Sequence, residues 1–236
     1  MPATATYAES FGTPPTIGLF PEEEALIARA SAKRRRDFTS GRECAREALA
    51  RLGLGKVPIL RGLRGAPQWP EGIAGSITHC AGYVAAAVAR TKELAAIGLD
   101  AEPSAPLPGG VLEMISLPAE RSRLRALSAS RPEVDWDCLL FCAKEAVYKA
   151  WFPLAGAWLG FADADITLAV DGTFSAQILV SAPAGAAPQL NGGFTGRWLA
   201  RDGITLTAIT VPALGPAQSA SRTGSPSGVH LGALHQ

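Results

Sequence analysis

Hydrophobic and polar residues alternate in three short runs in the first half of the chain, a pattern typical of β-strands. In the third run Ile97, Leu99 and Ala101 share one face, whereas Asp100 and Glu102 share the other. We therefore expect an antiparallel meander whose last strand presents two carboxylates away from the hydrophobic core. Its three strands are predicted at residues 73–78, 83–89 and 94–102.

A different period marks the helices. Between Trp136 and Trp151 the apolar residues recur at spacings of three and four, which predicts one long amphipathic helix that Pro153 ends. Glu145 and Lys149 lie one turn apart on the flank of its apolar stripe, and Lys144 lies beside them. Two further helices are expected, one opening at residue 21 and one over residues 38–52.

The order of these segments predicts an α+β protein in which a helix followed by a small antiparallel sheet occurs twice. Asp171-Gly172 and Asp202-Gly203 are signals for tight hairpins in the second half. The last residues are rich in Gly, Ser, Pro and Ala, which favours a disordered tail. We therefore divide the chain into an irregular segment (1–20), an N-terminal lobe (21–108), a C-terminal lobe (109–212) and a tail (213–236).

Composition narrows the class of protein. The 236 residues are 47% hydrophobic and 18% charged, enough for one large core or two fused smaller ones. A net charge of +1 argues against bulk nucleic-acid binding. No apolar run is long enough for a membrane span and no signal peptide is recognisable, so a cytoplasmic protein is expected. The four cysteines include no Cys-x-x-Cys and are predicted to be reduced core residues.

Asp100 and Glu102 are candidates for a metal site. Two carboxylates side by side repel each other unless a cation lies between them, and Mg²⁺ combines a few protein carboxylates with water and phosphate oxygens. The helix could add Glu145 as a ligand and Lys149 as a cation for phosphate. Each of these two pairs has a simpler interpretation. Glu and Lys four residues apart on a helix are often a solvated pair, and Asp-x-Glu at the end of a strand is often the start of a loop. The apolar neighbours of Lys144 and Glu145 favour a buried helix, where unpaired charges are costly.

These residues carry a family resemblance. Residues 75–80 (GSITHC), 97–102 (IGLDAE) and 141–150 (FCAKEAVYKA) resemble motifs of the 4′-phosphopantetheinyl transferases of the siderophore- and polyketide-activating class. The resemblance runs from Arg34 to Val211 and is closest to the actinobacterial and enterobactin-type members. Supporting stretches lie at residues 61–70, 158–161 and 202–209.

The resemblance implies two lobes related by a pseudo-two-fold axis, with coenzyme A between them. It implies transfer of the 4′-phosphopantetheine arm to a serine hydroxyl of an apo acyl or peptidyl carrier protein, with release of adenosine 3′,5′-bisphosphate. Carriers of fatty-acid, polyketide, non-ribosomal peptide and siderophore biosynthesis all remain open. It also implies a monomer with no nucleic-acid or membrane partner.

Roles in catalysis follow from the same resemblance. Asp100, Glu102 and Glu145 would bind Mg²⁺, with Mn²⁺ as the alternative ion. Glu145 would also accept the serine proton, directly or through a metal-bound water. Lys149 would stabilise or protonate the departing phosphate. Coenzyme A contacts are expected from Asp100, Lys144 and Lys149 in this half of the chain.

In the N-terminal half the resemblance assigns coenzyme A contacts to Arg34, Arg42, Arg61, Ser76 and His79. Arg34 and Arg42 are about two helical turns apart and could converge if their helix starts early. The family has lysine at position 61, so Arg64 is a candidate to replace Arg61. For His79 a phosphate or adenine contact is favoured over proton transfer. Tyr148 and Trp158 are expected to line the pantetheine channel, with core packing as the alternative for each.

Two other classes of function remain open from sequence. One is a non-catalytic coenzyme A or nucleotide-binding module, against which the intact set Asp100, Glu102, Glu145 and Lys149 argues. The other is a metal-dependent nuclease or phosphatase that uses the same residues. It fits poorly because no basic stretch beyond residues 33–36 exists to follow a nucleic-acid backbone.

Overall fold

The computed structural model describes residues 1–12 and 18–215. Its elements, in chain order, are β1 (Ala5–Phe11), α1 (Pro21–Leu26), α2 (Ala32–Arg51), η1 (Leu63–Gly65), β2 (Ile73–Cys80), β3 (Tyr83–Arg90), β4 (Leu94–Pro103), α3 (Val111–Ile115), α4 (Pro118–Ser130), α5 (Trp136–Ala155), η2 (Phe161–Asp163), β5 (Ala164–Leu168), β6 (Thr173–Ile178), η3 (Pro188–Gly192), β7 (Phe194–Arg201) and β8 (Ile204–Pro212).

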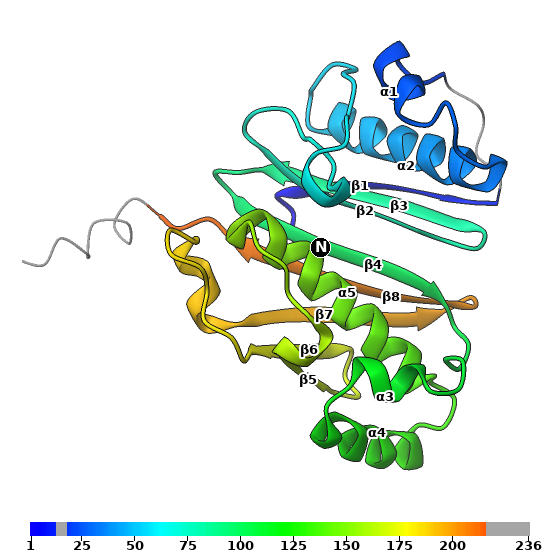
Figure 1. The fold of residues 1–236 in the computed structure, drawn as a ribbon, viewed down its shortest axis with the longest axis vertical. Helices are drawn as coiled ribbons and strands as arrows, with labels where there is room; N and C mark the ends of the chain where they lie inside the picture. Colours follow the sequence, from blue (N-terminus) through cyan, green and yellow to red (C-terminus); the bar gives the residue numbers. More distant parts are fainter. Residues whose placement is uncertain (13–17, 216–236) are drawn as a thin grey trace, which may run out of the picture.

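These elements form two lobes, each with a long helix on an antiparallel sheet (Figure 1). In the N-terminal lobe α2 packs on a three-stranded sheet of order β1-β3-β2. In the other lobe α5 lies across a five-stranded sheet of order β4-β8-β7-β6-β5. The predicted α+β class with two helix-on-sheet lobes is confirmed. Both hairpin predictions are confirmed as well, because Gly172 lies between β5 and β6, and Asp202 and Gly203, both with positive φ, between β7 and β8.

Two expectations for the sheets were wrong. Residues 5–11, expected to be irregular, form β1, which pairs antiparallel with β3 from Ala5↔Ala89 to Phe11↔Tyr83. The third strand of the expected meander, β4, leaves the first sheet and pairs with β8. β3 is buried along almost its whole length, so the backbone N–H and C=O groups on its second edge need partners, and the N-terminal segment supplies them. Such pairings are non-local and leave no periodic signal in the strand itself.

The two long helices also differ from prediction at their ends. α2 begins six residues earlier than expected, because the Ser31 side chain caps it by accepting a hydrogen bond from the Arg34 N–H at 3.3 Å. α5 continues past Pro153 to Ala155 and ends at Gly156, which is left-handed. Pro153 lies in the last turn, where it removes a single helical hydrogen bond while Trp151 stays buried in the core.

Two strands form the seam between the lobes. β2 and β4 lie side by side without a ladder of backbone hydrogen bonds, and β2 side chains bridge the gap. Ser76 Oγ accepts from the Leu99 N–H at 3.0 Å, and Thr78 Oγ1 accepts from the Ala101 N–H at 2.9 Å. Behind the seam a shared core joins the sheets, and it contains Ile97, Leu99 and Ala101, as predicted from their spacing.

Among the described residues, no helix has the length and apolarity that a membrane crossing requires. All four cysteines carry free thiols. Of the predicted tail, residues 213–215 still follow β8, and the Ala213 N–H donates to the Glu93 carbonyl at 3.0 Å. Residues 216–236 lie outside the described residues.

Candidate active site

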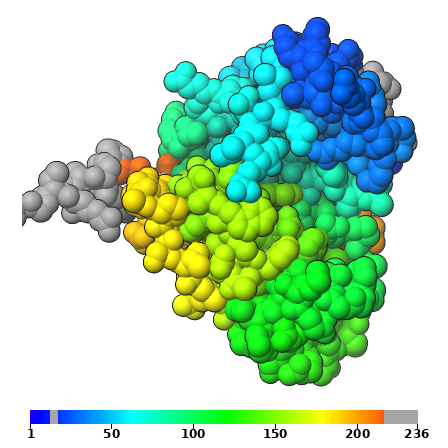
Figure 2. Space-filling model, viewed as in Figure 1, coloured from blue at the N-terminus to red at the C-terminus, as the bar shows by residue number. Residues whose placement is uncertain are grey.

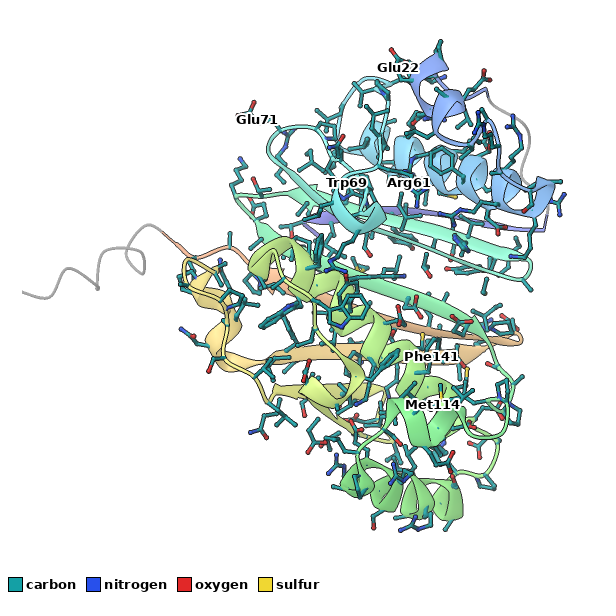
Figure 3. All side chains as sticks on the ribbon, viewed as in Figure 1. Glu22, Arg61, Trp69, Glu71, Met114 and Phe141 are labelled. Atoms are coloured by element: carbon teal, nitrogen blue, oxygen red, sulfur yellow. The ribbon has the colours of Figure 1, made fainter. Side chains whose placement is uncertain are left out.

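A cleft of about 400 Å³ lies between the lobes, and most of the residues selected from the sequence line it. α2, the segment around η1 and β2 form its N-terminal side, and α5 forms the other. Figure 3 shows Arg61 and Trp69 in the N-terminal lobe and Phe141 on α5. In Figure 2 the η1 region (cyan) lies against α5 (yellow-green). The cations and histidine of the cleft are Arg34, Arg42, Arg61, Arg64, His79 and Lys149.

A glycine lets α5 approach the carboxylate strand. A Cβ on Gly98 would lie 2.0 Å from the Ala146 carbonyl oxygen, so only glycine permits this crossing of β4 and α5. Gly98 and Asp100 share a face of β4 because they are two positions apart in the strand. The crossing therefore brings Asp100 within reach of the helix turn that carries Glu145 and Lys149.

Asp100 is held rigidly in this crossing and is only 5% exposed. Lys149 Nζ donates to Asp100 Oδ1 at 2.6 Å and to the Leu99 carbonyl at 3.0 Å. The Thr78 hydroxyl donates to the same carboxylate oxygen at 3.2 Å. Asp100 Oδ2 is buried and has no N–H or O–H partner in the described part of the chain. A buried carboxylate oxygen without a donor is well suited to bind a cation.

The two other predicted metal ligands are half-buried and feel the charge of Asp100. Burial, followed by the Asp100 charge, raises the pKa of Glu102 from 4.5 to about 7. The same two causes, in the same order, raise the pKa of Glu145. Lys149 opposes both changes. A cation among these side chains would relieve their repulsion.

Within residues 1–12 and 18–215, no group of three or more His, Cys, Asp or Glu side chains is already arranged to hold a metal ion. Mg²⁺ is usually bound through one or two carboxylates together with water and substrate phosphate. The donor set of Asp100 and its neighbours therefore fits an ion that arrives with a phosphorylated ligand.

Arg42 is the most buried cation of the cleft, at 6% exposure. Its Nε donates to the Ile59 carbonyl at 2.6 Å, and its guanidinium lies 4.2 Å from the centre of the Phe38 ring. Burial lowers its pKa to about 10, so it remains protonated at neutral pH. The early start of α2 places Arg34 two turns before Arg42, and both line the cleft.

His79 and Ser76 also lie in the cleft. Burial lowers the pKa of His79 below its usual value of 6.5; Asp37 opposes this change, and Lys149 and Arg34 add to it, which favours the neutral imidazole. A neutral ring can accept or donate a hydrogen bond to a ligand. The Ser76 hydroxyl is engaged by the Leu99 backbone in the seam, so Ser76 shapes the wall of the cleft.

Lys144 does not line the inter-lobe cleft. Its ammonium forms a buried ion pair with Glu120 at 2.9 Å and donates to the carbonyls of Phe161 at 2.6 Å and Ala164 at 2.9 Å. These three bonds use all three of its N–H donors. The expected coenzyme A contact through this ammonium is therefore not supported.

An aromatic wall continues the cleft on the C-terminal side. Tyr148 packs on Trp158 with ring centres 4.9 Å apart, and both line a smaller hollow of about 90 Å³ beyond Glu145. Arg64, which adopts a left-handed backbone with φ 54°, lies over the Trp158 ring at 5.4 Å. This cation–π contact joins the two lobes at the junction between the cleft and the smaller hollow.

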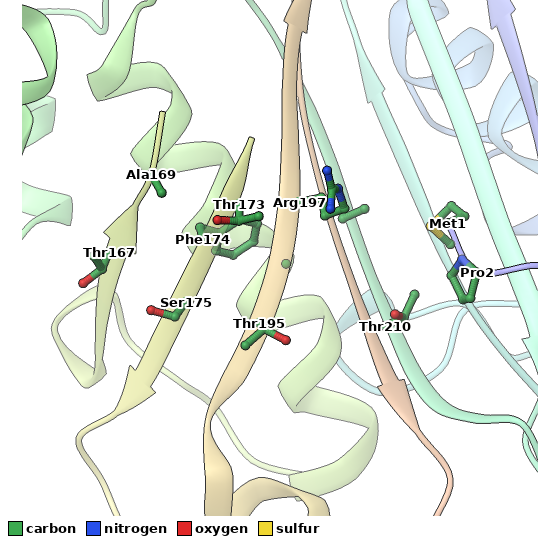
Figure 4. Close-up of a pocket in the computed structure, with 12 residues that line it drawn as sticks. Met1, Pro2, Thr167, Ala169, Thr173, Phe174, Ser175, Thr195, Arg197 and Thr210 are labelled. Atoms are coloured by element: carbon green, nitrogen blue, oxygen red, sulfur yellow. The ribbon is translucent and has the colours of Figure 1, made fainter. Parts of the chain in front are cut away.

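A larger and shallower hollow, of about 680 Å³, lies on the five-stranded sheet, with Arg197 and a group of hydroxyl side chains at its wall (Figure 4). None of the candidate catalytic or binding residues lines it, and it has no carboxylate. The inter-lobe cleft, rather than the larger hollow, is therefore the candidate active site.

Sequence reasoning missed two contributors to the site and one residue, outside the site, that keeps Lys144 from it. Thr78 holds Asp100, Phe38 stacks on Arg42, and Glu120 takes up Lys144. Thr78 lies two residues after the candidate Ser76 and therefore on the same strand face, which could have identified it from the sequence. Glu120 follows a proline at the start of a helix, another local signal. The stacking of Phe38 on Arg42 depends on the helix register, because the two are four residues apart and α2 begins before both.

Fold and cleft define a two-lobed protein in which several cations and the half-buried Glu145 line one cleft, beside the buried Asp100. The 4′-phosphopantetheinyl transferase N-terminal domain matches residues 22–89, and the 4′-phosphopantetheinyl transferase superfamily domain matches residues 96–199. The chain belongs to this family, as the sequence motifs predicted.

Individual relatives agree with this assignment. The 4′-phosphopantetheinyl transferase Svp of Streptomyces mobaraensis is 52% identical over 215 residues, which cover 91% of this chain and 86% of that protein. The 4′-phosphopantetheinyl transferase PptT of Mycobacterium tuberculosis is 48% identical over 221 residues, 89% of this chain and 96% of that protein. Enterobactin synthase component D of Salmonella typhimurium is 32% identical over 186 residues, 78% and 75% of the two chains.

Proposed function

We propose that this protein transfers the 4′-phosphopantetheine arm of coenzyme A to a serine of apo carrier proteins. The observation that carries the proposal is the inter-lobe cleft, where arginines of α2 and the η1 region share the lining with Glu145 and Lys149 of α5, and Lys149 contacts the buried Asp100. Coenzyme A has phosphate at its nucleotide end and a pyrophosphate beside the arm, so its charges match this arrangement. Family membership supplies the reaction class.

In this reaction the serine oxygen forms a bond to the phosphorus that carries the arm, and the bridging P–O bond of the pyrophosphate breaks. The protein's work is to position the reactants and stabilise the charge on the departing phosphate. The ammonium of Lys149 already contacts Asp100 and the Leu99 and Ile77 carbonyls, but it lines the cleft, so its positive charge can stabilise the departing phosphate. Glu145, whose pKa is raised by burial, accepts the serine proton directly or through a water. Adenosine 3′,5′-bisphosphate leaves from the arginine-rich end.

We assign the metal site to Asp100, Glu102 and Glu145, with Mg²⁺ as the ion. Support comes from the unpartnered Oδ2 of Asp100 and from the like-charge environment of the two glutamates. A bound Mg²⁺ would neutralise charge that develops on the pyrophosphate.

At the nucleotide end we assign coenzyme A contacts to Arg34, Arg42, Arg61 and His79. Arg64 and Trp158 then mark the point where the pantetheine arm turns from the cleft into the smaller hollow. We place the reaction in the cytoplasm and expect a monomer. The four free thiols support a reducing compartment.

Intact-mass spectrometry of an apo carrier protein tests the proposal. The carrier is incubated with this protein, coenzyme A and Mg²⁺, and we expect it to gain one phosphopantetheine group. EDTA and the variant Glu145→Gln should each abolish the gain, while Glu71→Gln, at an exposed surface position, should not. Coenzyme A binding without transfer to any of several carriers would instead favour a non-catalytic binding module. Phosphate release without a protein acceptor would favour a phosphatase.

A further inference from the structure

Each lobe contains one buried glutamate that the site described above does not use. Glu23 and Glu120 are 0% and 1% exposed, and each occupies the third position of a helix that starts with proline. Each carboxylate accepts a hydrogen bond from a backbone N–H three residues earlier, from Phe20 at 3.0 Å and from Leu117 at 2.7 Å. Each also forms an ion pair with a cation of the long helix in its lobe.

In the N-terminal lobe this arrangement reaches the cleft. Arg46 Nη1 donates to both oxygens of Glu23, at 2.9 and 2.8 Å. Glu23 Oε1 also accepts the Ile59 backbone N–H at 2.8 Å. The carbonyl of the same Ile59 accepts from Arg42 Nε at 2.6 Å. Glu23 therefore binds the N–H of Ile59, and the carbonyl of Ile59 binds the cleft arginine Arg42.

We propose that Glu23 is a positioning residue for coenzyme A: by fixing Ile59 it orients Arg42 toward the nucleotide end of the cleft. The inference rests on the proposed function. Arg61 follows Ile59 by two residues in the same extended segment and lines the same cleft, so it is oriented by the same anchor.

The burial of these groups gives the anchor its strength. Ile59 is 0% exposed, so its N–H has no water to replace a lost carboxylate. The Glu23 charge also supports the protonated form of Arg42, opposing the burial that lowers the pKa of Arg42. A guanidinium committed to Ile59 through Nε keeps its remaining N–H groups for a ligand.

Glu120 provides a matched control in the other lobe. It pairs with Lys144 at 2.9 Å and accepts the Ile166 backbone N–H at 2.7 Å. Like Glu23, it is buried, paired with a cation and hydrogen-bonded to two backbone N–H groups. Neither Glu120 nor Ile166 lines the cleft. Loss of either glutamate should disturb folding to a similar extent, and only loss of Glu23 should disturb the cleft arginines.

The experiment compares Glu23→Gln with Glu120→Gln at a temperature well below the unfolding midpoint of each. Isothermal titration with adenosine 3′,5′-bisphosphate measures binding at the nucleotide end alone. We expect Glu23→Gln to weaken binding roughly ten- to a hundredfold, as for loss of a hydrogen bond that involves a charged group, with Glu120→Gln at the wild-type value. In the transfer assay Glu23→Gln should raise KM for coenzyme A and leave kcat at saturation close to that of the wild type.

Glu23→Asp guards against a variant that fails to fold, because it keeps the charge for Arg46 while withdrawing the carboxylate from Ile59. It should show the same selective loss of binding. Wild-type affinity in a folded Glu23 variant, or equal losses in the Glu23 and Glu120 variants, would overturn the positioning role. Failure of the wild type to modify any carrier while it still binds the bisphosphate would overturn the proposed function and leave the positioning role standing.

Discussion

Replacing Glu102 with glutamine is expected to stabilise the metal-free protein and to reduce its response to Mg²⁺. Glu102 is half-buried near two other carboxylates, and burial and then the Asp100 charge raise its pKa from 4.5 to about 7. In the unfolded chain it loses its proton near pH 4.5. Between these values the folded state binds more protons than the unfolded state, so stability falls as the pH rises from about 4.5 to about 7.

The size of the effect follows from the same numbers. The difference between 4.5 and about 7, at about 1.36 kcal/mol per pH unit, sets an upper limit of about 3.4 kcal/mol. Solvent screens a half-buried group, which reduces the expected gain to on the order of 1–2 kcal/mol. For a chain of this size that gain corresponds to an increase in unfolding temperature of about 2–8 °C.

Thermal unfolding in EDTA at pH 8 measures this gain, with Glu71→Gln as the exposed control. Below pH 4 the difference between Glu102→Gln and wild type should vanish, because both folded and unfolded wild type are then protonated at this position. Added Mg²⁺ should raise the unfolding temperature of the wild type more than that of the variant. A variant that is less stable than wild type at pH 8, or one with the same gain below pH 4, would refute the assignment of Glu102 to a crowded carboxylate site.

Three further outcomes are expected. Gly98→Ala should lower the free energy of unfolding by about 3 kcal/mol or more in urea titration, because the new Cβ would meet the Ala146 carbonyl oxygen at 2.0 Å. The matched change Gly109→Ala, in open space, should have little effect. Comparable losses of stability in the two variants would argue against the close crossing of β4 and α5. Lys149→Met should abolish transfer and destabilise the protein by on the order of 2 kcal/mol, since it leaves Asp100 buried without its ion pair. Adding Asp100→Asn to this variant should restore the stability but not the transfer activity. Restored transfer in the double variant would remove Lys149 from the mechanism. Because burial raises the pKa of Cys80 to about 11, its reaction with a thiol reagent should be slow at pH 8 and accelerate toward pH 10, and a pH-independent rate would contradict this environment.

The sequence alone was sufficient for the features that depend on local periodicity. The period of two placed Asp100 and Glu102 opposite Ile97, Leu99 and Ala101, and the structure has that division. The helical period placed Glu145 and Lys149 on one flank of a buried helix. These patterns are visible because the residues of one face recur within a few positions of each other.

Tertiary structure decided the features that join distant segments. The pairing of β4 with β8, and the use of residues 5–11 to complete the first sheet, depend on which edges remain open once the lobes form. Whether the Lys144 ammonium was available to a ligand depended on Glu120, which lies on another helix and forms an ion pair with it. Thr78 and Lys149 meet on Asp100 because Gly98 lets the helix cross the strand closely. From the sequence, a charged side chain such as Lys144 beside the motif residues is a candidate to bind a ligand. Only the tertiary packing shows whether its hydrogen-bond donors are already used within the protein.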